Sequence, residues 1–257
     1  MKVLFIGDIV GPDAVDYVVR RLPELREEHR VDVVIANAEN CCVSKRTPFG
    51  GFGMEAGSID RLFATGVDVI TSGNHAWDAP DADRVLAHPR VIRPFNVPGH
   101  LAGTGIVTIP VGDEALTVVN IADAAAIPAV TPAYPSMLDL DFQGTVIVDF
   151  HGGEAMDKFG CAYALDGQVA AVLGTHTHEP SLTLHRLPGG TAFVLDVGMT
   201  GPSGGWQGID PLHMLAHYRN ESTEGYPPYQ LAAGPIQLGA VLLTIEDGLT
   251  TDIARLD

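Results

Sequence analysis

Five apolar, strand-like segments of this 257-residue chain each end in residues that can bind a metal ion. The runs that end them are Gly7-Asp8, Glu39-Asn40, Gly73-Asn74-His75, Asp149-Phe150-His151 and Gly174-Thr175-His176-Thr177-His178. Their carboxylates, amide oxygens and imidazoles are the ligand types that hold iron, manganese or zinc, whereas a structural zinc or an iron-sulfur cluster would use thiolates. Because ligands of open α/β sheets bind where loops leave the carboxyl ends of strands, we expect the runs to converge on one crevice.

The candidate ligands are more numerous than one closed metal site needs. They are Asp8, Glu39, Asn74, His151, His176 and His178. Two metals that share a bridging carboxylate are therefore the simpler arrangement. Taken alone, Asp8 or Glu39 would be better explained as a helix cap or a solvated loop carboxylate. Together with the other runs they favour a metal site, because carboxylates directly after apolar strands would otherwise carry a desolvation cost with no cation to offset it.

Three of the histidines stand in an informative context. His176 and His178 are two residues apart, so both imidazoles can face the same side of an extended segment, with a surface pair as the alternative. His75 stands beside the candidate ligand Asn74. A histidine in that place can reach toward a substrate rather than the metal, which suits a general acid.

The opening of the chain is typical of a βαβ unit. Residues 2–6 are a continuous apolar run, as in a strand buried on both faces, and residues 13–29 follow with apolar side chains at helical spacing. Pro23 inside that pattern predicts a helix that is kinked or shortened. Two more strands are predicted at residues 31–36 and 67–70. A helix is predicted between them at residues 58–65, with Gly66 as its end.

The remainder of the chain is richer in strands. Strand-like segments lie at residues 106–109, 115–121, 145–150, 169–173, 191–195 and 238–245. A βαβ half followed by a strand-rich half predicts an α/β fold of two facing mixed β-sheets flanked by helices. A single core can extend over roughly 250 to 300 residues, so residues 1–257 are predicted to form a single domain. Surface loops that cover the site or a homo-oligomer interface are predicted at residues 47–57, 124–135 and 201–230.

Composition restricts the partners and the compartment. The 32 acidic and 15 basic residues give a formal charge of −17, which repels long nucleic acid but leaves room for a small phosphate ester at a cationic metal site. The three cysteines, two of them adjacent as Cys41 and Cys42, indicate no disulfide framework. No apolar run near the N-terminus approaches the ~20 residues of a membrane span. A cytoplasmic protein with no membrane partner is therefore predicted.

The order of these motifs resembles the signature of the calcineurin-like metallophosphoesterases. The motifs that carry the resemblance are Gly7-Asp8, Gly73-Asn74-His75, His151 and Gly174-Thr175-His176-Thr177-His178. Two features depart from that signature, since Val10 replaces a metal-binding His and Glu39-Asn40 replaces a Gly-Asp-x-x-Asp run. Both departures resemble the bacterial YmdB-like branch, as do the runs Gly73-Asn74-His75-Ala76-Trp77-Asp78, Arg93-Pro94-Phe95-Asn96 and Asp196-Val197-Gly198-Met199-Thr200-Gly201-Pro202.

The resemblance implies a metallophosphoesterase-like sandwich and a phosphodiesterase that hydrolyses 2',3'-cyclic nucleotides. It implies two transition metal ions per chain, iron or manganese, that share a bridging hydroxide. The ligands it implies for the first metal are Asp8, Glu39, Asn40 and His178, and for the second Glu39, Asn74, His151 and His176. Asn40 would replace the His that is absent at Val10. His75 corresponds to the family's proton donor and would protonate the leaving ribose oxygen.

Two other functions are compatible with the same residues. A phosphomonoesterase or protein phosphatase would use the same centre, and a regulatory nucleotide-binding protein would bind metals and ligand with weak turnover. Cys41 and Cys42 are interpreted as packing beside the site, because oxygen and imidazole ligands already suffice. The glycines that lie close together after them are interpreted as a flexible loop rather than a phosphate cradle, since no Walker-type lysine follows; they are Gly50, Gly51, Gly53 and Gly57.

Overall fold

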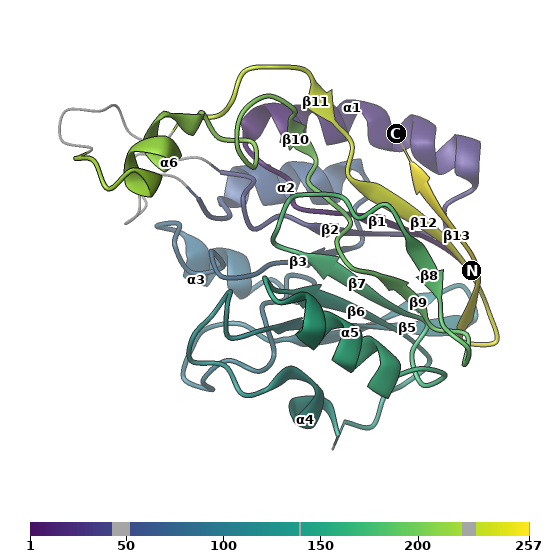
Figure 1. Ribbon diagram of the computed structural model, residues 1–257. Coiled ribbons are helices and arrows are strands. Elements are labelled where there is room, and N and C mark those ends of the chain that lie inside the picture. The colour runs from purple at the N-terminus through teal and green to yellow at the C-terminus, as the bar shows by residue number, and fades with distance from the viewer. Residues whose placement is uncertain (43–51, 139, 223–229, 257) are drawn as a thin grey trace.

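The computed structural model describes residues 1–42, 52–138, 140–222 and 230–256, which form four layers (Figure 1). Helices α1 (Pro12–His29) and α2 (Ala56–Thr65) cover the outer face of one β-sheet, and that sheet packs against a second. Helices α4 (Ala133–Met137) and α5 (Ala155–Ala164) lie outside the second sheet. The predicted α/β fold with two facing mixed sheets is therefore confirmed.

The first sheet has five strands in the order β13-β12-β1-β2-β3. In that order the strands span Leu249–Leu256, Ala240–Glu246, Lys2–Ile6, Val33–Asn37 and Val69–Thr71. Strands β1, β2 and β3 are parallel, while β12 is antiparallel to both β1 and β13. The loops that leave the carboxyl ends of the three parallel strands therefore start at one edge of this sheet.

The second sheet has six strands in the order β4-β5-β6-β7-β9-β8. In that order they span Ile106–Val111, Glu114–Ala122, Thr145–His151, Ala171–Thr175, Ala192–Val194 and Leu184–Arg186. Strands β5, β6, β7 and β9 are parallel, and the two edge strands are antiparallel to their neighbours. A separate two-stranded ribbon pairs β10 (Gly201–Pro202) with β11 (Ile236–Gln237).

The alternation of side chains along β1 explains how one strand contributes to two cores. Val3 and Phe5 point between the sheets, whereas Leu4 and Ile6 pack toward α1 and α2. A third core, which includes Val148, lies between the second sheet and α5. All of these side chains are essentially buried, and burying one such side chain contributes about 1.5–3 kcal/mol. Apolar packing on both faces of the strands thereby holds in place the strands that position the candidate ligands.

Helix α1 contradicts one prediction. It continues through Pro23 to His29 as one helix of 18 residues, so of the two predicted effects of Pro23 the shortening is wrong, while the kink stays a prediction. Pro23 is exposed, and water can reach the carbonyl group that the missing N–H leaves unpaired. Helix α2 ends as predicted, with Gly66 in a left-handed conformation at a φ of 109°.

The bounds of the predicted elements agree with the structure to within two residues. The elements that were not predicted are β8, β13 and the β10-β11 ribbon, together with α3 (Ala82–Leu86), α4 and α5. The stretch 201–230, predicted as a loop, contains β10 and helix α6 (Pro211–Tyr218). Among the described residues no helix is long and apolar enough to cross a membrane. The assignment of residues 1–257 to a single domain stays a prediction.

Candidate metal centre

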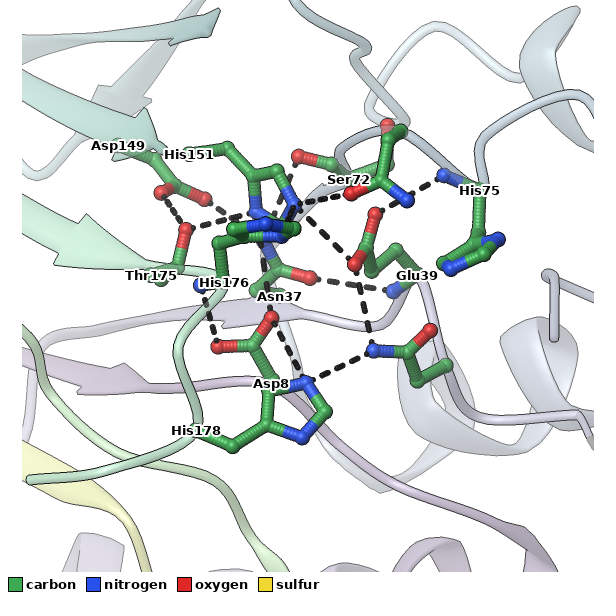
Figure 2. A network of polar contacts seen from close by, with 12 residues as sticks. Asp8, Asn37, Glu39, Ser72, His75, Asp149, His151, Thr175, His176 and His178 are labelled. Atoms are coloured by element: carbon green, nitrogen blue, oxygen red, sulfur yellow. Dashed lines mark hydrogen bonds and ion pairs between the residues drawn. The ribbon is translucent and has the colours of Figure 1, made fainter. Parts of the chain in front are cut away.

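The five predicted runs meet where the carboxyl ends of parallel strands from both sheets face each other (Figure 2). The first sheet contributes the loops after β1, β2 and β3, and the second contributes the end of β6 and the loop after β7. All eight predicted site residues lie in these segments, namely Asp8, Glu39, Asn40, Asn74, His75, His151, His176 and His178. The convergence joins residues that are up to about two thirds of the chain apart, such as Asp8 and His176, whose sequence separation is 168.

Three potential ligand atoms surround Nε2 of His151. Oε1 of Glu39 lies 3.2 Å from this nitrogen, Oδ1 of Asn74 lies 3.0 Å from it, and Nδ1 of His176 lies 3.1 Å from it. Glu39, His151 and His176 each offer a ligand atom within 4.8 Å of the others. A single imidazole nitrogen forms one hydrogen bond, so the other atoms gathered there need another partner. A shared cation would be such a partner.

Asp8, Asn40 and His178 form the neighbouring half of the cluster. Nδ2 of Asn40 lies 3.2 Å from Oε1 of Glu39 and 3.1 Å from Nε2 of His178. Oδ1 of Asp8 and Oδ1 of Asn40 are buried and make no hydrogen bond within the described part of the chain. Leaving such atoms unpaired costs about 1–3 kcal/mol each, so the donor set fits a cation at this place.

The backbone around the cluster is shaped for close approach. A Cβ at Gly73 would lie 2.2 Å from Nε2 of His151 and 2.3 Å from Oε2 of Glu39, so only glycine fits there. His176 and His178 have φ angles of 95° and 66°, in the left-handed region that non-glycine residues seldom occupy. The prediction that they lie on an extended segment is therefore wrong. Strain of this kind persists only where surrounding contacts hold it, and it concentrates at functional sites.

Supporting hydrogen bonds set which imidazole nitrogen faces the centre. The Thr175 hydroxyl donates to Oδ1 of Asp149 at 2.6 Å, so its oxygen accepts from Nδ1 of His151 at 3.0 Å. Nδ1 of His178 donates to the carbonyl oxygen of Gln207 at 2.9 Å, because a carbonyl oxygen can only accept. In both neutral imidazoles Nε2 then keeps its lone pair for a metal.

Asp149 and Thr175 stood in the predicted runs without a role of their own, and Asn37 and Gln207 stood outside those runs. The amide of Asn37 donates to Oδ2 of Asp149 at 3.0 Å, beneath the cluster, and Asn37, Asp149 and Thr175 are fully buried. Their only signal was a polar residue at the end of an apolar strand. Cys41 and Cys42 are buried, as expected, and burial raises the pKa of both thiols, which keeps them from acting as thiolates. Gly50 and Gly51 lie outside the described residues.

Known proteins resemble the chain over nearly its whole length. The family described as YmdB-like protein matches residues 4–256. The chain belongs to this family. A Bacillus subtilis (strain 168) relative, named 2',3'-cyclic-nucleotide 2'-phosphodiesterase, is 30% identical over 253 residues, which cover 96% of this chain and 92% of the relative. A Mycoplasma pneumoniae relative, named putative phosphatase/phosphodiesterase, is 31% identical over 260 residues, which cover 96% of this chain and 88% of the relative.

Two crystal structures share the YmdB-like fold. A hypothetical protein from Thermus thermophilus has a TM-score of 0.89 and 34% identity, with 99% of this chain and 97% of that chain covered. A phosphatase from Mycoplasma pneumoniae has a TM-score of 0.82 and 27% identity, with 95% and 87% covered. The predicted resemblance to the YmdB-like branch is thus confirmed. The prediction of an enzyme of the hydrolase class is confirmed with it.

Without bound metal ions, the buried acidic and imidazole groups of the YmdB-like site shift one another's pKa values. Burial opposes the proton on His151, but Glu39 and Asp8 outweigh it and raise the pKa of His151 to about 9. Burial also opposes the ionisation of Glu39, yet the neighbouring His151 holds the pKa of Glu39 well below its usual range. Burial and the adjacent His151 lower the pKa of His176 to about 3. Burial raises the pKa of Asp8.

His75 occupies a different position from the other imidazoles. Its Nδ1 lies 2.7 Å from Oδ2 of Asp78, its backbone N–H donates to Oε2 of Glu39 at 3.1 Å, and its side chain is 25% exposed. Burial lowers the pKa of His75, but Asp78 and Glu39 outweigh that effect and raise it above the ordinary value. In Figure 2 His75 lies beyond Glu39, away from His151 and His176. A protonated imidazole with one nitrogen anchored and solvent access can act as a proton donor.

Proposed function

We propose that this YmdB-like protein is a metal-dependent phosphodiesterase that hydrolyses 2',3'-cyclic nucleotides. The observation that carries the proposal is the convergence of three ligand atoms on Nε2 of His151, next to buried oxygens of Asp8 and Asn40 that accept no hydrogen bond within the described part of the chain. The choice of substrate is supported by the name of the Bacillus subtilis relative.

Two metal ions would share this set of donors. Asp8, Asn40 and His178 would hold one ion, Asn74, His151 and His176 would hold the other, and Glu39 would contact both. Iron is the expected metal and manganese the alternative, since oxygen and imidazole ligands suit both. When bound, the pair of ions would activate a water molecule and neutralise charge on the phosphoryl group.

The protein's own residues would supply orientation and a proton. Hydrogen bonds from Asp149 through Thr175 orient the imidazole of His151, and the carbonyl of Gln207 orients the imidazole of His178. Each ring then presents Nε2 to the centre. His75, held by Asp78 at 2.7 Å, would donate its proton to the departing ribose oxygen. An alkoxide is a poor leaving group, and general acid catalysis of this kind contributes typically ~10²- to 10⁴-fold.

The acidic surface bears on the size of the substrate. A formal charge of −17 repels polyanions, so a mononucleotide can approach the site while a long nucleic acid is disfavoured. A cytoplasmic location and a homo-oligomer stay predictions.

A substrate panel tests the proposal. Metal-loaded protein should hydrolyse 2',3'-cyclic AMP with a higher kcat/KM than it shows for p-nitrophenyl phosphate, a phosphopeptide or single-stranded RNA at the same salt. Faster turnover of the two monoesters would favour the phosphatase function that the Mycoplasma pneumoniae name suggests. Binding of the cyclic nucleotide without turnover would instead indicate a regulatory protein, and better cleavage of RNA would contradict the argument from charge.

A further inference from the structure

Helix α5 carries a lysine that the proposed reaction does not use. Lys158 is 1% exposed, although an ammonium group is costly to bury unless it is paired. Its Nζ lies 3.3 Å from Oδ2 of Asp196 and donates to the carbonyl oxygen of Thr175 at 2.9 Å. Asp196, just beyond β9, is 3% exposed. The two charges therefore form a buried pair that contacts Thr175, the residue before His176.

The Asp196 carboxylate holds the residue on the other side of His176. Its Oδ2 accepts the backbone N–H of Thr177 at 3.1 Å and the Thr177 hydroxyl at 2.8 Å. Its Oδ1 accepts the N–H of Gly198 at 2.8 Å. Together Lys158 and Asp196 thus hold the backbone immediately before and after His176, and Thr177 also precedes His178.

The segment that begins at Asp196 also ties the two ligand loops of different sheets to each other. The N–H of Met199 donates to the carbonyl of His178 at 3.1 Å, and the N–H of Thr200 donates to the carbonyl of Asp8 at 2.9 Å. Asp8 follows β1 of the first sheet, whereas His178 follows β7 of the second. Asp196 therefore anchors one end of a segment that sets the distance between two candidate ligands.

We propose that Lys158 and Asp196 are positioning residues that hold His176 and His178 in their left-handed conformations, at φ angles of 95° and 66°, so that both imidazoles face the metals. This inference rests on the metal centre of the proposed function. Well-packed apolar residues often stabilise a fold as much as a buried ion pair does. The effect of the pair should therefore be found in the geometry of the ligands, and hence in metal affinity.

Metal affinity can be measured without turnover. Chelator-competition titrations with Co²⁺, read through its absorption bands, should show roughly 10- to 100-fold weaker binding for Lys158→Met, about the loss typical for groups that orient metal ligands. Thr177→Val removes the hydroxyl group that donates a hydrogen bond to Asp196, so this variant should also bind Co²⁺ more weakly and with altered absorption bands. Thr177→Ser keeps that hydroxyl and should bind like the wild type. If Lys158→Met does not fold, the comparison of Thr177→Val with Thr177→Ser still tests whether Asp196 positions the ligands.

Leu165→Ala controls for general loss of stability. Leu165 is buried in the third core, just past the end of α5, so its variant should melt at a lower temperature with unchanged Co²⁺ affinity. Lys158→Met and Thr177→Val variants that melt lower but bind Co²⁺ within about twofold of the wild type would overturn the positioning role. Failure of the wild type itself to bind Co²⁺ would instead contradict the proposed function.

Discussion

The stability of the metal-free protein should depend on pH in a way that reports the contact between Glu39 and His151. Burial opposes the charge on His151, but Glu39, with Oε1 at 3.2 Å from Nε2, raises the pKa of His151 from an ordinary 6.5 to about 9. The native state then keeps this proton up to about pH 9, whereas the unfolded chain releases it near pH 6.5. The stabilisation is therefore fully present below pH 6.5 and is lost as pH rises through about 9.

The size of the effect follows from the same two values. Raising the pKa from 6.5 to about 9 is a shift of about 2.5 pH units, and at 1.36 kcal/mol per unit this corresponds to about 3 kcal/mol. A domain is stable by about 5–15 kcal/mol in total, so the change is large enough to measure. His75, whose pKa is also raised, contributes with the same sign. The lowered pKa of His176, about 3, keeps that residue neutral throughout this range.

Urea unfolding in the presence of a chelator, at pH 6.5 and at pH 9, measures this difference. The matched variant is Glu39→Gln, which removes the carboxylate beside His151 and should lose much less stability between the two pH values. Comparing the two proteins cancels the general repulsion that grows with pH in a chain of charge −17. Equal losses in wild type and variant would refute the idea that Glu39 holds the proton on His151.

Four substitutions test the roles assigned to individual residues. His75→Ala should keep its metal yet lose ~10²- to 10⁴-fold activity on 2',3'-cyclic AMP, with a smaller defect on a nitrophenyl phosphodiester; equal defects would mean that His75 positions the phosphate. Glu39→Gln should retain less metal than Asn40→Ala in elemental analysis, and similar contents would count against Glu39 as the bridge. Gly73→Ala places a Cβ 2.2 Å from Nε2 of His151, so its metal affinity should fall at least about tenfold, and unchanged affinity would contradict that geometry.

Elements with a strong local apolar pattern could be predicted from the sequence, whereas elements with a weak one could not. The apolar run of β1 and the helical spacing of α1 extend over enough residues to be recognised. Strand β8 is as short as β3 and β9, but its side chains are half-buried or exposed and form no apolar run, and β10 has only two residues. Strand β13 is an edge strand whose side chains are mostly half-buried or exposed, so its alternation is weak. The shortening at Pro23 was wrongly predicted because the cost of a proline inside a helix depends on whether water reaches the carbonyl group that it leaves unpaired.

The candidate site was predictable in its residue types but not in its support. Each ligand run lies at the carboxyl end of its strand or within two residues after it, so a local pattern identifies it. The conformation of His176 and His178 depends instead on tertiary contacts. Lys158 and Asp196 are 38 residues apart and neither stands in a run of ligand type, so only the folded chain shows that Lys158 contacts Thr175 and that Asp196 contacts Thr177.

The number of metal ions bound per chain tests the dinuclear centre most directly. Elemental analysis of the protein as isolated should give close to two transition metals per chain, with iron or manganese as the main species. Activity on 2',3'-cyclic AMP should fall when a chelator removes them and should return as occupancy approaches two. Saturation at one metal per chain with full activity would contradict the shared role of Glu39 and the account of the site built on it.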